Sequence, residues 1–138
     1  MYMYLHKNKK GFTLIELMVV VAVIGILALL GLRLYTGQQQ KAKNAIVKAN
    51  CGTVQTLIQA NLADSTTTEV YTGIDSLIES AGIHIPDGAQ QEANGSLDNE
   101  GEVVVTNPAD DTNGVFYINA TGFGGSTVYD APGLSARK

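Results

Sequence analysis

One long apolar segment stands near the start of the chain. From Phe12 to Leu32 the only polar side chains are those of Thr13 and Glu16. At about 1.5 Å per residue, a helix of this length spans the roughly 30 Å hydrocarbon core of a bilayer. The pattern therefore predicts a transmembrane helix over residues 12–34. Arg33, near its end, is expected to extend its charged group toward the lipid headgroups.

Beyond this segment the pattern becomes that of an amphipathic helix. Apolar side chains recur at spacings of three and four residues and therefore share one face: Val47, Cys51, Val54, Ile58 and Leu62. We expect the helix to continue over residues 35–64 and to carry the rest of the protein on this face. It is predicted to end near Asp64, because the polar run from Ser65 to Thr68 interrupts the pattern.

The remainder of the chain predicts a small head over residues 65–138. A short amphipathic helix is expected over residues 72–82, with Thr72 as its N-cap. The polar, turn-rich stretch 86–101 is predicted to be an exposed loop.

Three strands are expected in the rest of the head, over residues 102–106, 115–120 and 126–129, and short connections favour an antiparallel meander. The apolar side of this small sheet is expected to pack on the amphipathic helix. The predicted fold class is therefore α+β, a long N-terminal helix packed on a small antiparallel sheet.

Glu16 is the one ionisable residue inside the apolar segment. An unpaired carboxylate near a bilayer centre costs about 2.5–3.5 kcal/mol on insertion scales, so such residues usually have a partner and a function. A cut between Gly11 and Phe12 would create an amino terminus one helical turn away, and that amine is a suitable partner. The alternative is that Glu16 only complements the positive end of its own helix.

Residues 1–11 form a short basic leader that includes Lys7, Lys9 and Lys10. An ordinary secretory signal has a small-residue cleavage site after its apolar region, so that the apolar region is removed. No such site follows the apolar segment here. Removal of residues 1–11 alone would leave the apolar helix at the N-terminus of the mature protein.

The sequence KGFTLIELMVV, from Lys10 to Val20, resembles the processing site of bacterial type IV pilins and type II secretion pseudopilins. The resemblance implies that a prepilin peptidase cleaves after Gly11 and methylates the new N-terminal residue, Phe12. It also implies that Glu16 pairs with the N-terminal amine of a neighbouring subunit. An inner-membrane assembly platform and its ATPase would then build a homo-oligomeric helical filament, and the implied fold is the type IV pilin fold.

The resemblance also fixes the expected location. Precursor and mature protein would lie in the inner (cytoplasmic) membrane as single-pass proteins with the head outside the cytoplasm. After assembly the protein would form a filament at the cell surface. Lysines and arginine flank the apolar segment on both sides, so the orientation depends on the processing motif and not on the distribution of positive charge.

Two features of the apolar segment concern helix packing. Small residues recur every three positions: Ala22, Gly25, Ala28 and Gly31. Such residues let helices approach closely, which suits a filament core. They are also common in transmembrane helices generally. The sequence departs from the family at Arg33, where many members have a proline that bends the helix. Gly31 and Gly37 are alternative sources of local flexibility.

No grouping of residues indicates an enzyme or a cofactor. Cys51 is the only cysteine, which excludes an intrachain disulfide, and its place on the apolar face predicts a small buried side chain. Asp110, Asp111 and Asn113 are weak calcium candidates, because calcium prefers oxygen ligands and some related pseudopilins bind it. The EF-hand spacing is missing, and an Asx-rich turn is favoured.

The charges are unevenly distributed along a chain of formal net charge −4. Arg33 and three lysines, Lys41, Lys43 and Lys48, follow the apolar segment. The head, in contrast, is acidic. This separation favours contact between the acidic head of one subunit and the basic stem of another, or else serves only to keep the head soluble. Direct binding of nucleic acid is not expected, since phosphate contacts need clustered lysine or arginine.

Three functions follow from these observations. The first is a structural subunit of a type IV pilus, and the second is a major-type pseudopilin of a type II secretion system. The third is a membrane-anchored binding domain that does not polymerise.

Overall fold

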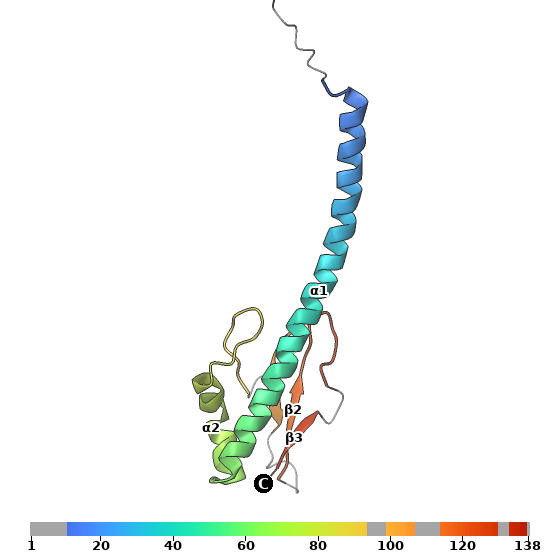
Figure 1. Cartoon of the computed structure of the whole chain (residues 1–138). Coiled ribbons are helices and arrows are strands. Elements are labelled where there is room, and N and C mark those ends of the chain that lie inside the picture. Colours follow the sequence, from blue (N-terminus) through green and yellow to red (C-terminus); the bar gives the residue numbers. More distant parts are fainter. Residues whose placement is uncertain (1–10, 94–98, 107–113, 130–132, 138) are drawn as a thin grey trace, which may run out of the picture. The chain divides into compact units, whose positions relative to one another are not determined.

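The computed structural model describes residues 11–93, 99–106, 114–129 and 133–137 (Figure 1). It contains a long helix α1 (Leu14–Leu62), a shorter helix α2 (Thr67–Ser80) and three strands: β1 (Val103–Thr106), β2 (Phe116–Ala120) and β3 (Leu134–Ala136). The predicted α+β fold class is confirmed. The chain divides into two compact units, Met1–Gly37 and Gln38–Lys138.

The first unit consists, in its described part, of the apolar beginning of α1. This helix is long and apolar enough near the N-terminus to cross a membrane. Large apolar side chains in this helix and just before it are exposed: 77% of Leu14 and 87% of Phe12, for example, are accessible. A continuous apolar surface of this kind is stable only when lipid or other protein covers it.

The second unit is built around the amphipathic part of α1. All five residues predicted to form its apolar face are buried: Val47, Cys51, Val54, Ile58 and Leu62. They share one hydrophobic cluster with Ile74 of α2 and with Phe116 and Ile118 of β2. The cluster confirms that this face of α1 carries the sheet.

The three strands form an antiparallel sheet in the order β1-β2-β3, the predicted meander. Val103 pairs with Ala120 between β1 and β2, and Phe116 pairs with Ala136 between β2 and β3. Alternate residues of β2 are buried, which is the pattern of a sheet with one face on a core.

Helix α2 begins earlier than predicted. Its N-cap is Thr66, whose side chain accepts a hydrogen bond from the backbone N–H of Glu69, and the Glu69 side chain accepts one from the backbone N–H of Thr66. Thr72, the predicted N-cap, lies inside the helix. The prediction was wrong because the threonines after Ser65 interrupt the apolar pattern but include the residue that starts the next helix.

The prediction of a third strand over residues 126–129 was also wrong. Residues 126–129 form a single bridge, Thr121 with Thr127, and β3 lies later in the chain. The predicted glycine turn does occur: Gly124 and Gly125 both have positive φ, and the backbone N–H of Gly122 donates to Ser126 O at 2.7 Å. This turn brings the chain back beside the end of β2 alone, so the rest of the β2 edge pairs with β3.

Part of the predicted exposed loop 86–101 is buried against β1. Gln91 is 1% exposed; its Nε2 donates to Val103 O at 2.8 Å, and its Oε1 accepts from Val103 N at 3.2 Å. Two residues later, Ala93 O accepts from Val105 N at 3.0 Å. A glutamine amide has both a donor and an acceptor, so it can replace a strand peptide here, which the polarity of the sequence did not indicate.

Polar side chains of α1 hold the loops of the second unit, which has no disulfide. Lys43 forms a salt bridge with Asp87, and its Nζ lies 4.5 Å from the centre of the Phe123 ring. Asn50 donates to His84 O at 2.9 Å, and Gln55 donates to Ser135 O at 2.7 Å. In Figure 1, α2 and β3 lie on different sides of this part of α1.

Candidate functional site

Thr13 and Glu16 cap the start of α1 through reciprocal hydrogen bonds. The backbone N–H of Thr13 donates to Glu16 Oε2 at 2.8 Å, and the Thr13 hydroxyl donates to the same oxygen at 2.8 Å. In return, the backbone N–H of Glu16 donates to Thr13 Oγ1 at 3.4 Å. This is a capping box, in which a threonine N-cap and an acid three residues later satisfy each other's backbone donors.

The local sequence explains this geometry. Thr13 directly precedes Leu14, the first residue of α1, and threonine is a favoured N-cap. Glu16 lies in the first turn, where the helix dipole favours a negative charge. The carboxylate therefore has a partner within its own chain, as the alternative for Glu16 requires, and pairing with the amine of another subunit stays a prediction.

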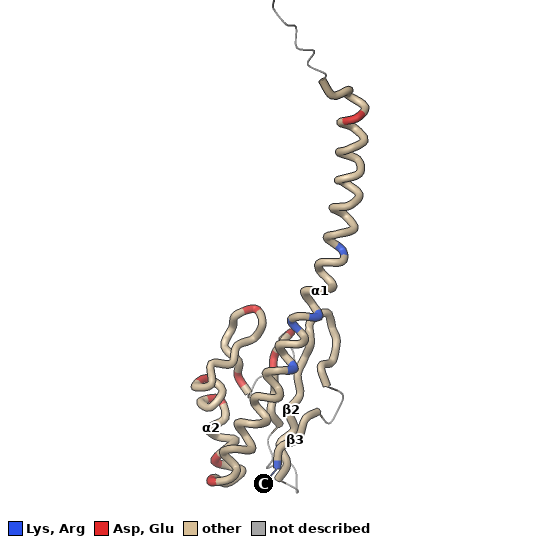
Figure 2. Tube along the Cα trace, viewed as in Figure 1, with Lys and Arg blue, Asp and Glu red and all other residues tan. Residues whose placement is uncertain are grey.

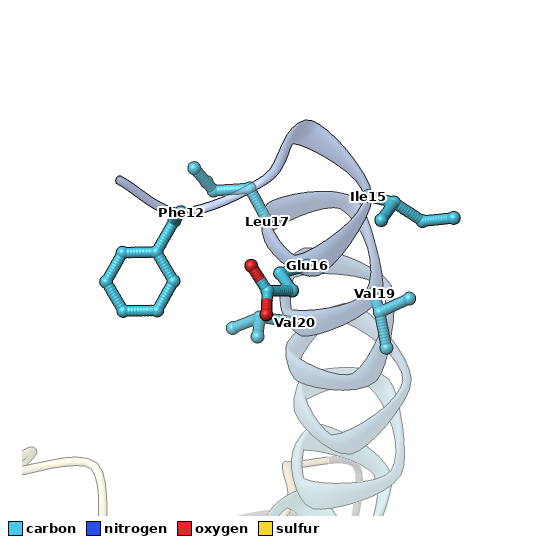
Figure 3. Close-up of a pocket in the computed structure, with 6 residues that line it drawn as sticks. All are labelled: Phe12, Ile15, Glu16, Leu17, Val19 and Val20. Atoms are coloured by element: carbon cyan, nitrogen blue, oxygen red, sulfur yellow. The ribbon is translucent and has the colours of Figure 1, made fainter. Parts of the chain in front are cut away.

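A shallow groove surrounds this carboxylate (Figure 3). Glu16 is the single charged member of its lining, which is otherwise apolar: Phe12, Ile15, Leu17, Val19 and Val20. The Phe12 ring and the Glu16 carboxylate lie on the same side of α1 in this view. The residue that would become the N-terminus after cleavage at Gly11 is therefore in the same groove as the acid.

The predicted packing residues lie farther along the same helix. Four small residues belong to its exposed part: Ala22, Gly25, Ala28 and Gly31. Apart from the neighbouring backbone of its own helix, a Cβ added at Gly25 or Gly31 would meet nothing within 4 Å. The fold of the single chain therefore does not require glycine at these positions, and their role in close helix packing stays a prediction.

Helix α1 continues without interruption through the position of Arg33. The Thr36 hydroxyl donates to Arg33 O at 3.1 Å. The Arg33 carbonyl therefore accepts a hydrogen bond from a side chain about one turn later in the helix. Gly37, the other expected source of flexibility, is the last residue of the first unit.

Cys51 lies in the core, as predicted, and is 0% exposed. Burial raises the pKa of its thiol to about 11. A reactive cysteine needs a lowered pKa and an accessible sulfur, so this residue is unsuited to nucleophilic chemistry.

The other sequence candidates give no additional site. Among the described residues, no three histidine, cysteine, aspartate or glutamate side chains are grouped so as to hold a metal ion. The weak calcium candidates, Asp110, Asp111 and Asn113, lie outside the described residues, as do residues 1–10 of the leader.

Thr13 is the residue that sequence reasoning missed. The expected partner of Glu16 was a charged group, whereas the structure provides a neutral hydroxyl and a backbone N–H. The signal was present in the sequence, because threonine followed three residues later by glutamate is the signature of a capping box.

Comparison with known proteins extends the picture beyond geometry. Residues 6–32 match the family described as the prokaryotic N-terminal methylation motif. Fimbrial protein EcpB of Eikenella corrodens is 38% identical over 74 residues, which cover 54% of this chain and 46% of that protein.

Two relatives come from Dichelobacter nodosus. A probable minor fimbrial protein is 35% identical over 85 residues, covering 62% of this chain and 54% of its own length. A type IV major fimbrial protein, FimA, is 43% identical over 56 residues, which cover 41% of this chain and 36% of that protein. The chain thus spans about half or less of the length of these curated relatives. No solved structure matches it.

Proposed function

We propose, from the premise that this chain belongs to the type IV pilin family, that it is a structural subunit of a type IV pilus filament. The observation that carries the proposal is the methylation motif at residues 6–32, which includes the first part of α1, where the apolar side chains are exposed. The family is one of structural proteins and not of enzymes.

Processing is the first step of this function. A prepilin peptidase cleaves between Gly11 and Phe12 and methylates the Phe12 amine. The apolar helix is then the N-terminus of a single-pass membrane protein with its head outside the cytoplasm. The methylation motif supports this step, since it spans the junction.

Assembly is the second step, and Glu16 directs it. Both hydrogen bonds from Thr13 end on Oε2, and no described residue donates to Oε1. The free oxygen is available to the Phe12 amine of a neighbouring subunit while the capping box stays closed. An inner-membrane platform and its ATPase extract the subunit, and the stripe of Ala22, Gly25, Ala28 and Gly31 packs against other copies in the filament.

The names of the relatives favour a pilus over a type II secretion pseudopilus. All of those reported above are fimbrial proteins. Deletion of the gene separates the two functions: loss of surface filaments supports the pilus. Intact pili with secreted enzymes retained in the periplasm would instead assign the chain to secretion.

The test of the proposed function replaces Glu16 and follows the chain through processing and assembly. Glu16→Ala and the near-isosteric Glu16→Gln should yield a membrane protein that begins at methylated Phe12 but is absent from filaments sheared from cells. Val20→Ala, in the same groove, is the matched control and should assemble. Intact mass and N-terminal sequencing provide the readout. Normal filaments of either Glu16 variant, or wild-type filaments that retain Met1, would contradict the proposal.

A further inference from the structure

The second unit has two distinct sides, defined by side chains of α1. Asn44, Lys48 and Gln55 are separated by four and seven residues and therefore share one side of the helix. Asn44 donates to Ser126 Oγ at 3.0 Å, and Gln55 donates to Ser135 O of β3 at 2.7 Å. Lys48 thus lies on the side of α1 that is turned toward β3.

Three exposed cations gather on this side. Lys41 lies seven residues before Lys48, again on the same side of α1, and Arg137 follows β3 directly. We name these three residues the basic side. Figure 2 shows the blue positions along α1 and at the end of β3.

Three exposed acids lie on the other side of α1, around α2, whereas the exposed Glu100 lies at the glycine turn, where it accepts from Gly124 N at 3.0 Å. Asp64 lies in the turn between α1 and α2, and Glu79 lies one helical turn after Asp75. The Asp75 carboxylate accepts from Ala93 N at 2.8 Å, which brings the neighbouring Glu92 to α2. We name Asp64, Glu79 and Glu92 the acidic side; the red positions around α2 in Figure 2 include it.

Neither side takes part in a salt bridge among the residues that the structure describes. Among the described residues, the one salt bridge joins Lys43 to Asp87 and uses none of the six residues named above. Opposite charges on two sides of the same small body attract the unlike sides of two copies and repel the like sides.

We propose that a second copy of this chain docks its acidic side on the basic side of the first. The inference rests on the proposed function, since a filament brings heads side by side. Each copy contacts one neighbour through its basic side and another neighbour through its acidic side. The contact is therefore head-to-tail and can repeat without closing, as a helical polymer requires. Asp64, Glu79 and Glu92 of one head then face Lys41, Lys48 and Arg137 of the next.

Charge reversal in the full chain tests this contact. Lys41→Glu with Lys48→Glu places acids against acids, and Glu79→Lys with Glu92→Lys places bases against bases. Each pair should lower the yield of sheared filaments roughly tenfold or more, because like charges across an interface are strongly unfavourable. The four substitutions together restore opposite charges and should return the yield to within about twofold of wild type.

The four-substitution variant also separates a copy of this chain from a membrane surface as the partner. If anionic lipid headgroups were the partner, the lysine variants alone would lower the yield, the acid variants would have no effect, and the combination would stay low. That pattern overturns the proposal. Unchanged yield in both reversed pairs overturns it as well.

Disulfide trapping gives an independent readout of the geometry. Lys48→Cys with Glu79→Cys places one thiol on each side, and copper phenanthroline should convert filaments of this variant into a ladder of cross-linked multimers. Either single substitution should give no ladder, because a head-to-tail contact needs one thiol from each side. The native Cys51 is buried and should not react.

Thr53→Cys with Glu79→Cys is the matched control for trapping. Thr53 is exposed on α1, five residues beyond Lys48 and therefore on a different side, so no ladder is expected. A ladder from the control or from a single variant would overturn the assignment of sides. Normal filaments with no ladder from the main pair would overturn the docking and leave the filament function intact, whereas failure of wild-type chain to enter filaments would remove the proposed function itself.

Discussion

The backbone N–H and the hydroxyl of Thr13 both donate to the same oxygen of Glu16, at 2.8 Å each. At the start of α2, Thr66 and Glu69 repeat the arrangement with distances of 2.9 and 2.8 Å. One pair begins the apolar part of α1, and the other belongs to the second unit. Because the two surroundings differ, the geometry is encoded locally by a threonine and a glutamate three residues apart.

Loss of the Thr13 hydroxyl should loosen the first turn of α1. In Thr13→Val the backbone N–H of Glu16 loses its acceptor, Thr13 Oγ1, and an N-cap of this kind stabilises a helix by about 0.5–2 kcal/mol. We expect the Glu16 amide to exchange with solvent roughly fivefold faster in the full chain in detergent micelles, measured by NMR. Thr13→Ser keeps the hydroxyl and should exchange as wild type; equal rates in all three proteins would contradict the cap.

The second capping box should contribute to the stability of the head. Thr66→Ala is expected to lower the free energy of unfolding by about 1 kcal/mol, since the N-cap acceptor is lost. For a unit of this size the melting temperature should fall by about 4–8 °C, followed by circular dichroism. Thr72→Ala, inside the helix, is the control and should change little. A larger effect at Thr72 than at Thr66 would move the helix start back to the position predicted from sequence.

Asn44 should be the most important polar link between α1 and the glycine turn. Its Oδ1 accepts from Phe123 N at 2.7 Å, and its Nδ2 donates to Ser126 Oγ at 3.0 Å. Asn44→Ala should cost about 2 kcal/mol of unfolding free energy, because two partners lose their hydrogen bonds. Asn50→Ala removes the one bond to His84 O and should cost about 1 kcal/mol. Denaturant titration followed by tyrosine fluorescence measures both, and equal losses would count against this role of Asn44.

Gly101 should tolerate no side chain. Its φ is +85°, and an added Cβ would lie 2.7 Å from the Phe123 ring and 2.9 Å from Ile85 Cγ2. Gly101→Ala is expected to destabilise the head by about 2–4 kcal/mol, the sum of backbone strain and overpacking. Gly88→Ala has a similar φ of +93° but open space, so it should show the strain alone. Equal destabilisation of the two variants would show that the Phe123 contact is unimportant.

The Cys51 thiol should make the head less stable at high pH. Burial raises its pKa to about 11 in the folded protein, above the ordinary value of 9.0. A raised folded pKa means that the unfolded chain loses its proton first, so the contribution is complete below pH 9 and is lost as the pH rises toward 11. The slope of this loss should approach about 1.4 kcal/mol per pH unit.

Comparison with Cys51→Ala isolates this contribution from the titration of lysines and tyrosines. The difference in unfolding free energy between wild type and Cys51→Ala should shrink between pH 9 and 11. Thiol reagents at pH 8 should label the native protein only after denaturant is added. Rapid native labelling, or a difference that stays constant with pH, would contradict a buried protonated thiol.

The sequence predicted best where a long pattern was repeated. The apolar face of α1 extends over several turns from Val47 to Leu62, so errors at single positions could not hide it, and each of its residues is buried. The three-residue strand β3 is too short to show alternation, and this is why its place was missed. Gln91 was read as loop because polarity was equated with exposure, although its amide groups complete the bonding of Val103.

The site was predicted in part for a similar reason. Long apolar character and a lone acid identified Glu16 from sequence, because a charge in such a segment is costly. Thr13 escaped notice because its contribution is a hydroxyl and a backbone N–H, which carry no charge. The charge segregation across α1 depends on the contacts of Asn44 and Gln55 with distant residues, which only the folded chain brings together.

The arrangement of Gln91 and Ala93 beside β1 has a consequence for the protein at high local concentration. Their amide and carbonyl groups occupy Val103 and Val105, the positions where an added strand would bond. At the opposite edge β3 is short, and its Ser135 carbonyl accepts from Gln55. Sheets without open edges resist strand-by-strand amyloid growth. Among the described residues, these contacts therefore disfavour edge-to-edge association of heads that are crowded together.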